Sequence, residues 1–340
     1  MDQSQPLLSV RNLKTFFRMD EGTAKAVDGV SFDVQPGQIV GIVGESGCGK
    51  SVTIKSVLRI VQKPGRIVGG EILFRRQGEM LDLAGLDARG EAMRAIRGSE
   101  IALIPQEPMA ALSPVHTIGN QLIEAVRLHQ DVSQSEAEQI VIKRMSEVGV
   151  PSPEERMSMY SWELSGGLRQ RVMIAMALSC HPKLLIADEP TTAIDVTTQA
   201  QVLSLLRGLQ EHHDMAIIFI THDLGVVAQI ADEVAIMYLG RIVEKGPVRE
   251  IFHHPKHPYT VNLIRAIPQL GDLRGRRQLA PIQGTVPSLL ERPAGCSFHP
   301  RCDSFMAGLC DTRSPELNQI SSGHDVRCFL HETASEKVAP

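Results

Sequence analysis

A glycine-rich segment near the start of the chain has the residue types and spacing of a phosphate-binding loop. It reads Gly44-Glu45-Ser46-Gly47-Cys48-Gly49-Lys50-Ser51 and fits G-x-x-x-x-G-K-[ST]. Glycines let the backbone turn tightly and aim N–H groups at phosphate oxygens. The lysine can reach the outer phosphates, and the serine hydroxyl can bind Mg²⁺. The alternative is an accidental glycine turn, which the apolar strand pattern before it and the helical pattern after it disfavour.

Three polar positions elsewhere could complete a nucleotide site. Asp188 and Glu189 follow the apolar run 184–187, at the carboxyl end of an expected parallel strand, where such sheets bind ligands. An acid there can hold the Mg²⁺ of a nucleotide, and Glu189 is placed to orient or deprotonate water. His222 follows the apolar run 216–220 and could donate to a γ-phosphate, although a lone histidine is usually structural.

A serine and two glycines, Ser165-Gly166-Gly167, open a strong helical pattern that runs to about Ser179. A helix N-terminus with a serine hydroxyl favours anions. A Ser-Gly-Gly sequence alone is weak support, because most such sequences are loops.

Four of the six cysteines lie within 33 residues of the C-terminal part of the chain. They are Cys296, Cys302, Cys310 and Cys328. Four thiolates suit tetrahedral zinc or an iron–sulfur cluster, although no C-x-x-C pair occurs. The alternative is four reduced or casually oxidised thiols.

The elements that must position these residues follow from periodicity and turn signals. The run 38–43 is a buried strand, and Ile54, Val57, Leu58 and Val61 mark the helix after the glycine loop. A long helix is expected from about Ile118 to Val150. Further strands are expected at 7–10, 24–27, 30–34, 71–74, 100–104, 184–187, 216–220 and 234–239.

Composition and charge narrow the possible functions. The 340 residues carry a net charge of -4, so nucleic acid is not the expected partner. No run of 18 uncharged apolar residues occurs, and the first residues lack the pattern of a signal peptide. We therefore expect a cytoplasmic protein. His253, His254 and His257 are interpreted as a surface connection, and residues 268–294 as a linker or an extended excursion.

Taken in order, these motifs resemble the nucleotide-binding subunit of an ABC transporter over about residues 7–246. Residues 44–51 look like Walker A, Gln106 like the Q-loop glutamine and residues 164–168 like the signature. Residues 184–189 look like Walker B with its glutamate, residues 193–195 like the D-loop, and His222 like the switch histidine. The signature ends in Leu168 where glutamine is usual, and the D-loop has Ile194 where leucine is usual.

The resemblance implies an α/β fold: a P-loop NTPase with a RecA-like core, an antiparallel β subdomain and a helical subdomain at about 108–178. It implies an ATPase domain over 1–250 and a cysteine-rich extension over 251–340. Lys50, Gln106, Glu189 and His222 would be catalytic, and Ser51, Gln106 and Asp188 would hold Mg²⁺. The ATP-binding residues would be Phe17, Gly44, Glu45, Ser46, Gly47, Cys48, Gly49, Lys50, Ser51, Val52, Gln106, Ser165, Gly166, Gly167 and Asp188. On sequence alone, Phe17 is as well explained as a core aromatic residue as by stacking on adenine.

Several other stretches are similar to the dipeptide/oligopeptide importer ATPases. These are residues 167–177, 221–227 and 257–260, and the tail pattern Gly-Cys-x-Phe-x-x-Arg-Cys at 295–302. The resemblance implies ATP-driven uptake of di- or oligopeptides, with nickel or small glycosides as alternatives. It also associates the four tail cysteines with a four-iron, four-sulfur cluster, with zinc as the alternative.

The same resemblance implies partners, because one Walker A and one signature in one chain need a second ATPase subunit. A homologous heterodimer is favoured and a homodimer is possible, with two membrane-spanning permease subunits and an external solute-binding protein. The chain would lie on the cytoplasmic face of the membrane. A nucleic-acid ATPase of the same superfamily is disfavoured, since only 113 residues separate Ser51 from Ser165, with no sustained heptads. All phosphate-contacting motifs precede Gly246, so a chain ending there should still bind ATP.

Overall fold

The computed structural model describes residues 5–107, 111–192, 195–267 and 282–332. The chain folds into two compact units, and each unit combines segments that are distant in sequence. The first unit contains Met1–Leu7, Val34–Ile39 and Gly85–Ile220, and the second contains Leu8–Asp33, Val40–Ala84 and Thr221–Pro340. The glycine loop therefore belongs to the second unit, and the Asp188-Glu189 segment to the first.

Three neighbouring parallel strands lie in the first unit. They are β6 (Ile101–Ile104), β7 (Leu184–Asp188) and β8 (Ala216–Thr221), with β7 in the middle. Every residue of β7 and β8 is buried, as their apolar sequences predict. Ile104 pairs with Ala187, and Asp188 pairs with Ile220. The carboxyl ends of the strands therefore lie next to one another, and this edge positions the polar residues that follow each strand.

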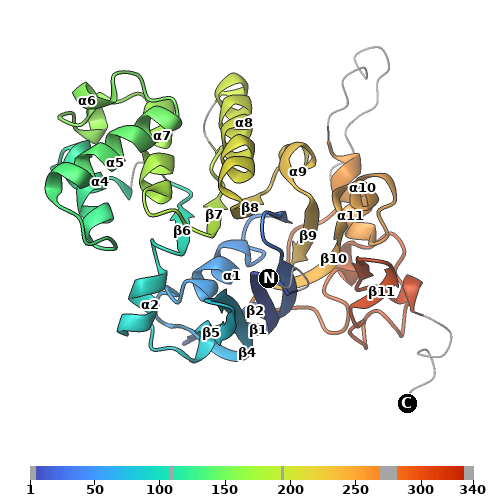
Figure 1. Cartoon of the computed structure of the whole chain (residues 1–340). Coiled ribbons are helices and arrows are strands. Elements are labelled where there is room, and N and C mark those ends of the chain that lie inside the picture. The colour runs from blue at the N-terminus through green and yellow to red at the C-terminus, as the bar shows by residue number, and fades with distance from the viewer. Residues whose placement is uncertain (1–4, 108–110, 193–194, 268–281, 333–340) are drawn as a thin grey trace, which may run out of the picture. The chain divides into compact units, whose positions relative to one another are not determined.

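Helices make up most of the rest of the first unit (Figure 1). They are α2 (Glu91–Ile96), α4 (Ile118–Arg127), α5 (Gln134–Glu147), α6 (Pro153–Arg156), α7 (Gly166–Leu178) and α8 (Val196–His213), with a short 3-10 turn, η2 (Ser161–Glu163). The helices α4 to α7 fall in the segment predicted to form the helical subdomain. The first residues of that predicted segment, 108–110, lie outside the described residues.

The single long helix expected over 118–150 is wrong. The chain forms two helices, α4 and α5, because Ser133 begins a new one. Its hydroxyl accepts a hydrogen bond from the Glu136 N–H at 3.3 Å, while the Glu136 carboxylate accepts from the Ser133 N–H at 2.8 Å. This reciprocal capping box satisfies backbone donors at a helix start and fixes the break between the two helices.

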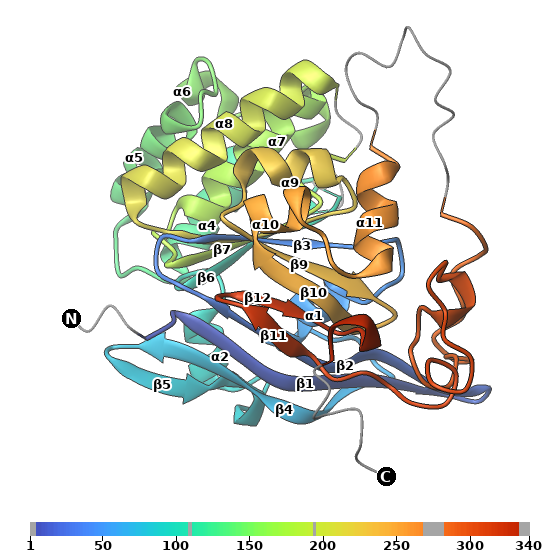
Figure 2. The same cartoon turned by 90° about the vertical axis from the view of Figure 1, so that its right-hand side faces the viewer.

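The second unit contains a four-stranded antiparallel sheet, which agrees with the predicted antiparallel β subdomain (Figure 2). Its strands, in the order β2-β1-β4-β5, are β1 (Leu8–Met19), β2 (Gly22–Val34), β4 (Gly65–Arg76) and β5 (Glu79–Asp82), and η1 (Leu83–Gly85) follows. The predicted strands at 24–27 and 30–34 are parts of one strand, and 71–74 is part of a longer one. The missed residues are largely polar and partly exposed, so alternation of apolar side chains did not mark them.

A second group of strands in this unit carries the glycine loop. The strand β3 (Ile39–Val43) pairs in parallel with β9 (Glu233–Tyr238), and β10 (Arg241–Pro247), β12 (His324–Val326) and β11 (Asn318–Ser321) follow antiparallel. The helices are α1 (Lys50–Val57), α9 (Leu224–Ile230), α10 (Val248–His253) and α11 (Pro258–Arg265), with 3-10 turns η4 (His299–Arg301) and η5 (Phe329–His331). Because β12 pairs with β10 at Glu244↔Val326, the C-terminal segment (residues 251–340) contributes strands next to β10.

Two local predictions need correction. The helix α1 ends at Val57, so Val61 lies beyond it. The interpretation of His257 as a surface residue is also wrong, because its side chain is buried and caps α11. Its Nδ1 accepts a hydrogen bond from the Tyr259 N–H at 3.1 Å, and burial lowers its pKa to about 3. Of the predicted linker 268–294, residues 268–281 lie outside the described residues.

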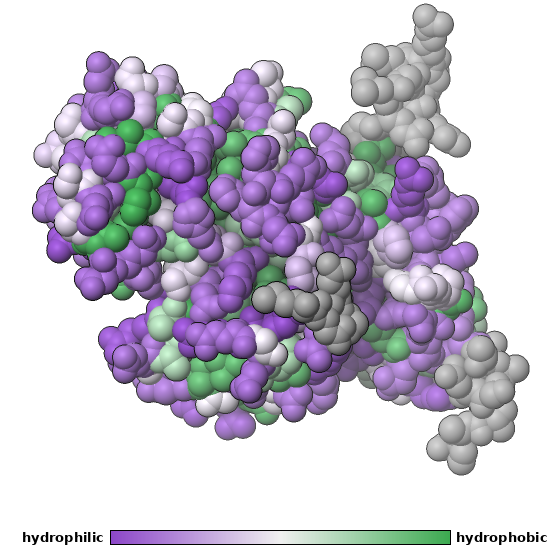
Figure 3. Space-filling model, viewed as in Figure 1, coloured by the Kyte–Doolittle hydropathy of each residue, from purple (hydrophilic) through white to green (hydrophobic). Residues whose placement is uncertain are grey.

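The molecular face in Figure 3 is mostly hydrophilic, with smaller hydrophobic patches between the charged side chains. Within the described ranges, no helix is both long enough and apolar enough to cross a membrane.

Candidate functional site

The glycine loop joins β3 to α1, and its glycines are there for steric reasons. Gly49 has φ +106°, and a Cβ at this residue would lie 2.2 Å from the Ala26 carbonyl oxygen. A Cβ at Gly44 would lie 2.2 Å from the Met237 carbonyl oxygen. Side chains are therefore excluded where the backbone must turn and present N–H groups. The loop has the strand–turn–helix setting of a P-loop.

Lys50 lies in the loop as the sequence predicts. Its side chain is buried, and its Nζ donates to the carbonyl oxygens of Gly44 at 2.6 Å and Glu45 at 3.2 Å. The ammonium group is thus held by the loop itself, where it can exchange carbonyl oxygens for phosphate oxygens. Ser51 follows in the first turn of α1.

Cys48 belongs to the same loop, but its side chain serves packing. It is fully buried, and burial raises the pKa of its thiol. Its N–H donates to the Glu45 carbonyl oxygen at 3.2 Å, and its own carbonyl oxygen accepts from the Gly240 N–H at 2.8 Å. Any role in phosphate binding therefore belongs to the backbone of this residue.

Glu45 is held by two residues of the C-terminal segment that were not among the predicted site residues. Arg301 donates to both carboxylate oxygens, from Nη1 at 2.8 Å and from Nη2 at 3.0 Å. The Glu45 N–H donates to the Tyr259 hydroxyl at 3.1 Å. The Glu45 side chain is the main cause of a raised Arg301 pKa, so this guanidinium is always charged. The only available sequence signal was the arginine in the tail pattern at 295–302.

The acidic segment lies in the first unit, at the carboxyl end of β7. Asp188 and Glu189 are both buried, and Glu189 has φ +49°, an uncommon conformation for a side-chain-bearing residue. The Gln106 Nε2 donates to Glu189 Oε2 at 3.1 Å, and the Thr192 hydroxyl donates to the same oxygen at 3.1 Å. The structure therefore brings together Gln106 and Glu189, which are 83 positions apart, and adds Thr192, which the sequence did not indicate.

The signature segment presents a helix N-terminus to the surface. Ser165 is exposed and caps α7, with its hydroxyl accepting from the Leu168 N–H at 3.4 Å. A Cβ at Gly166 would have no neighbouring atom within 4 Å, so the space beside this glycine is open. This geometry suits the binding of an external anion.

In the predicted D-loop, Ala193 and Ile194 lie outside the described residues, while Asp195 caps α8 by accepting from the Thr198 N–H at 3.0 Å.

The remaining nucleotide-site predictions lie in the second unit. His222 follows β8 and directly precedes Asp223, which caps α9. The Phe17 ring is half-buried and lies over Gly65, its partner across the sheet. Stacking on adenine and core packing are both compatible with this position, so the role of Phe17 stays a prediction.

The four tail cysteines are free thiols that lie close enough to influence one another. Cys296 donates its N–H to the Cys310 carbonyl oxygen at 2.8 Å. Burial, together with the thiols of Cys296, Cys302 and Cys310, raises the pKa of Cys328 to about 12. Across the described part of the chain, however, no three His, Cys, Asp or Glu side chains are arranged to hold a metal ion. The predicted zinc or iron–sulfur site is therefore not formed as a ligand group here.

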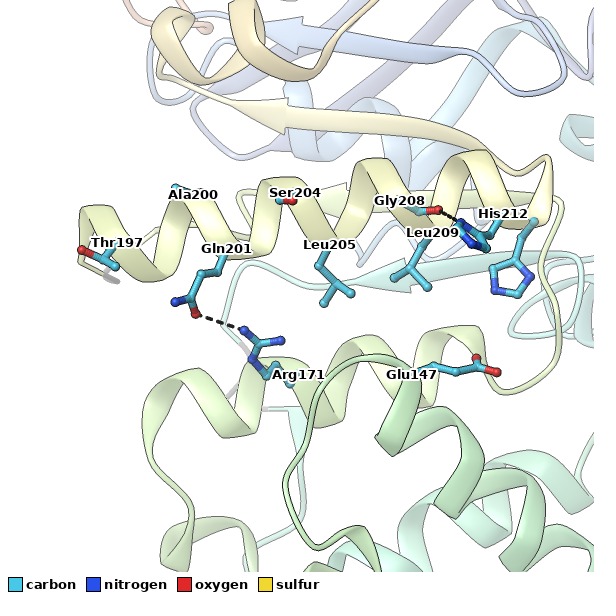
Figure 4. Close-up of a pocket in the computed structure, with 11 residues that line it drawn as sticks. Glu147, Arg171, Thr197, Ala200, Gln201, Ser204, Leu205, Gly208, Leu209 and His212 are labelled. Carbon is cyan, nitrogen blue, oxygen red and sulfur yellow. Dashed lines mark hydrogen bonds between the residues drawn. The ribbon is translucent and has the colours of Figure 1, made fainter.

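A groove of about 930 Å³ runs along α8 in the first unit (Figure 4). The side chains of Leu205 and Leu209 face it from α8, and Arg171 donates to Gln201 Oε1 across it at 3.1 Å. None of the side chains that line it is a predicted nucleotide ligand.

Comparison with known proteins extends these observations. Residues 27–192 match the family model described as ABC transporter, and residues 243–310 match the one described as oligopeptide/dipeptide transporter, C-terminal region. A putative peptide import ATP-binding protein of Brucella ovis is 48% identical over 331 residues, covering 96% of this chain and 97% of that relative. The dipeptide transport ATP-binding proteins DppD of Bacillus subtilis and Escherichia coli are 46% and 42% identical, covering 98% and 95% of this chain and 97% and 96% of those relatives.

Solved structures agree on the fold. A dimeric ATP-binding cassette bound to ADP and Pi superimposes with a TM-score of 0.62 at 23% identity, covering 71% of this chain and 99% of the cassette. The cassette CbiO1 of Clostridium perfringens gives a TM-score of 0.61 at 25% identity, covering 76% and 96%. The predicted ABC cassette fold is thus confirmed. This chain belongs to the ABC transporter ATP-binding proteins of the dipeptide and oligopeptide import family.

Proposed function

We propose that this chain is the ATP-hydrolysing subunit of an ABC importer that takes up di- or oligopeptides. The observation that carries this function is the likeness to peptide import ATP-binding proteins over 95–98% of the chain. The built P-loop and the buried Asp188-Glu189 pair agree with it. The relatives named here support peptides over the nickel and glycoside alternatives.

The chemistry is phosphoryl transfer to water, in which positioning and electrostatics do most of the work. Loop N–H groups and Lys50 bind the phosphates of ATP. Glu189 polarises the attacking water, and His222 donates to the γ-phosphate. Ser51, Gln106 and Asp188 provide oxygen donors suited to Mg²⁺, which neutralises phosphate charge when bound.

Assembly follows from the presence of one P-loop and one signature segment in the chain. Ser165 and Gly166 are exposed at the N-terminus of α7, which supports the contact of this segment with ATP on a second ATPase subunit. We favour a homologous heterodimer over a homodimer, with two membrane-spanning permease subunits and an external solute-binding protein. The complex would place this chain on the cytoplasmic face of the membrane. Gln106, in contact with Glu189, would report the nucleotide state to the permeases.

We also propose an ATPase domain over 1–250 and a cysteine-rich extension over 251–340, with a four-iron, four-sulfur cluster on Cys296, Cys302, Cys310 and Cys328. Soft sulfur donors suit the cluster, and Cys296, Cys302 and Cys310 lie close enough to Cys328 to contribute to its raised pKa, which supports a common site. Zinc on the same thiols is the alternative.

Anaerobic purification with iron, sulfide and zinc analysis tests the cluster. A brown protein with about four irons per chain, lost in Cys302→Ser and kept in Cys180→Ser, is expected for a four-cysteine cluster. A colourless wild-type protein with one zinc, or with no metal, contradicts the cluster.

Reconstitution tests the transport function. The full chain, its partner ATPase and the permeases are placed in vesicles with the solute-binding protein, and uptake of labelled dipeptides is followed with and without ATP. Uptake should require ATP and fail with Lys50→Ala. ATP hydrolysis without peptide uptake, together with uptake of nickel or a glycoside, would overturn the peptide assignment.

A further inference from the structure

The carboxylate of Glu45 is paired with a rigidly held arginine. The Arg301 side chain is only 4% exposed, against 26% for Glu45. Besides its two bonds to Glu45, its guanidinium donates to the Gln283 carbonyl oxygen at 3.0 Å and to the Tyr238 hydroxyl at 3.4 Å. It also lies 5.8 Å from the Tyr238 ring centre. A guanidinium fixed on several sides holds its carboxylate partner in one geometry.

An aromatic cluster fixes the backbone of the same glutamate. The Tyr259 hydroxyl accepts from the Glu45 N–H at 3.1 Å, and the Tyr259 ring lies 4.8 Å from Tyr238 and 5.3 Å from Phe298. Tyr259 and Phe298 are buried and come from the C-terminal segment. Residues more than 200 positions from the P-loop therefore hold both the side chain and the backbone of Glu45.

The position of Glu45 matters for the phosphate-binding lysine. The Glu45 carbonyl oxygen accepts from Lys50 Nζ at 3.2 Å and from the Cys48 N–H at 3.2 Å. A shift of Glu45 would therefore move the anchor of Lys50 and a donor group of the loop.

The charge of Glu45 matters as well. A nucleoside triphosphate is a polyanion, and an unpaired carboxylate in the loop that binds it would repel it. The bidentate Arg301 contact neutralises that carboxylate, and the pairing of a partly buried carboxylate also offsets its desolvation cost.

We propose that Arg301 is a positioning residue for ATP binding, which neutralises Glu45 and fixes the P-loop from the C-terminal segment. The inference rests on the proposed function, since it assumes that this loop binds ATP. It assigns to the C-terminal segment a part in the ATP site itself, separate from any metal on the neighbouring cysteines.

Binding of ATP with Mg²⁺ to the full chain, measured by calorimetry, tests the proposal with three variants and a control. Arg301→Gln should weaken ATP binding roughly 10- to 100-fold, since it leaves a carboxylate unpaired in the loop. Arg301→Lys, which keeps the charge without the bidentate fork, should lose less than Arg301→Gln. The double variant Glu45→Gln/Arg301→Gln should regain most of the affinity, because no carboxylate remains to repel ATP. If Arg301 only stabilised the fold, the second substitution would not restore ATP affinity.

Arg292→Gln is the matched control. Arg292 also comes from the C-terminal segment and pairs with a carboxylate, Asp28, at 2.5 Å. Its hydrogen-bond partners, Asp28, Lys25 and Leu239, lie outside the P-loop. Its loss should leave ATP affinity within about threefold of wild type, because Asp28 stays paired with Arg241 at 2.8 Å and substitutions away from a site have small effects.

Several outcomes overturn the proposal: unchanged affinity in Arg301→Gln, a double variant no better than Arg301→Gln, or an equal loss in Arg292→Gln. If Arg301→Gln does not fold, Glu45→Gln decides, because affinity at or above wild type supports repulsion by Glu45 and a more than tenfold loss contradicts it. Failure of the wild-type chain to bind ATP would instead refute the proposed function.

Discussion

Two glutamates lie in the two loops that we propose act on ATP, and the protein holds them by different means. Glu45, in the P-loop, accepts hydrogen bonds from the Arg301 guanidinium at both carboxylate oxygens. Glu189, after β7, accepts at Oε2 from the amide of Gln106 and the hydroxyl of Thr192. A cationic partner cancels the charge of the first glutamate. At Oε2, two neutral donors orient the second glutamate, which we propose polarises the attacking water.

The two loops also differ in where their supports come from. Arg301 and Tyr259 lie 256 and 214 positions from Glu45, whereas Gln106 and Thr192 lie 83 and three positions from Glu189. The P-loop therefore depends on the folding of the C-terminal segment, and the acidic loop depends on its own turn and on the residues that follow the neighbouring strand β6. The following predictions test this contrast, beginning with the largest effect.

Replacing Glu189 with Gln should give the largest effect. Glutamine keeps the size of the side chain but removes the charge that polarises water. We expect turnover to fall by roughly two to four orders of magnitude, the range for loss of a general base. ATP binding should persist, because the P-loop contacts remain. Single-turnover hydrolysis and ATP titration of the assembled ATPase measure both quantities, and near-normal turnover would show that another group acts as the base.

The support of the P-loop by the C-terminal segment predicts that the stability of the protein depends on pH through His257. This residue caps α11, the helix that carries Tyr259. Burial lowers the His257 pKa to about 3, so the folded protein keeps this ring neutral when the unfolded chain takes up a proton. Its contribution to stability is full above about pH 6.5 and is lost progressively towards pH 3. Between pH 7 and pH 5 the free energy of unfolding should fall by about 2 kcal/mol from this group.

His257→Asn provides the comparison, because asparagine can still cap the helix but does not titrate. The variant should be less stable at pH 7, since it loses the packing of the ring against Phe298. Its stability should nevertheless change less between pH 7 and pH 5 than that of wild type. Urea unfolding at both pH values gives the two differences, with the exposed His212→Asn as a control. Equal differences in wild type and His257→Asn would contradict the lowered pKa.

The elements that could be predicted from sequence are those whose signal is local. The runs that became β7 and β8 are apolar throughout because both faces are buried, and the glycine loop is short enough for its spacing to specify its geometry. The break at Ser133 was also local, since Ser133 and Glu136 form a capping box, but helical periodicity on both sides obscured it.

The supports of Glu45 could not be predicted in the same way. A tyrosine and an arginine more than 200 positions away carry no sequence signal of an ion pair or a hydrogen bond with the P-loop. The burial of His257 was missed because its nearby prolines suggested a surface turn. The sequence also predicted ATP binding by a chain ending near Gly246, and the contacts of Tyr259 and Arg301 now lead us to expect weaker binding by such a truncation.

The smallest effect on turnover should come from replacing Thr192, which supports Glu189 in the loop after β7. Its hydroxyl donates to Glu189 Oε2 at 3.1 Å, and valine has the same shape without the donor. A neutral hydrogen bond contributes about 0.5–1.5 kcal/mol, so Thr192→Val should lower turnover roughly 3- to 10-fold. The bond orients the carboxylate without touching the P-loop, so the dissociation constant of ATP should not change. Thr192→Ser keeps the hydroxyl and should retain turnover close to wild type, which separates loss of the donor from loss of packing. Equal turnover in Thr192→Val and wild type would mean that Gln106 and the strand edge position Glu189 without help from this hydroxyl.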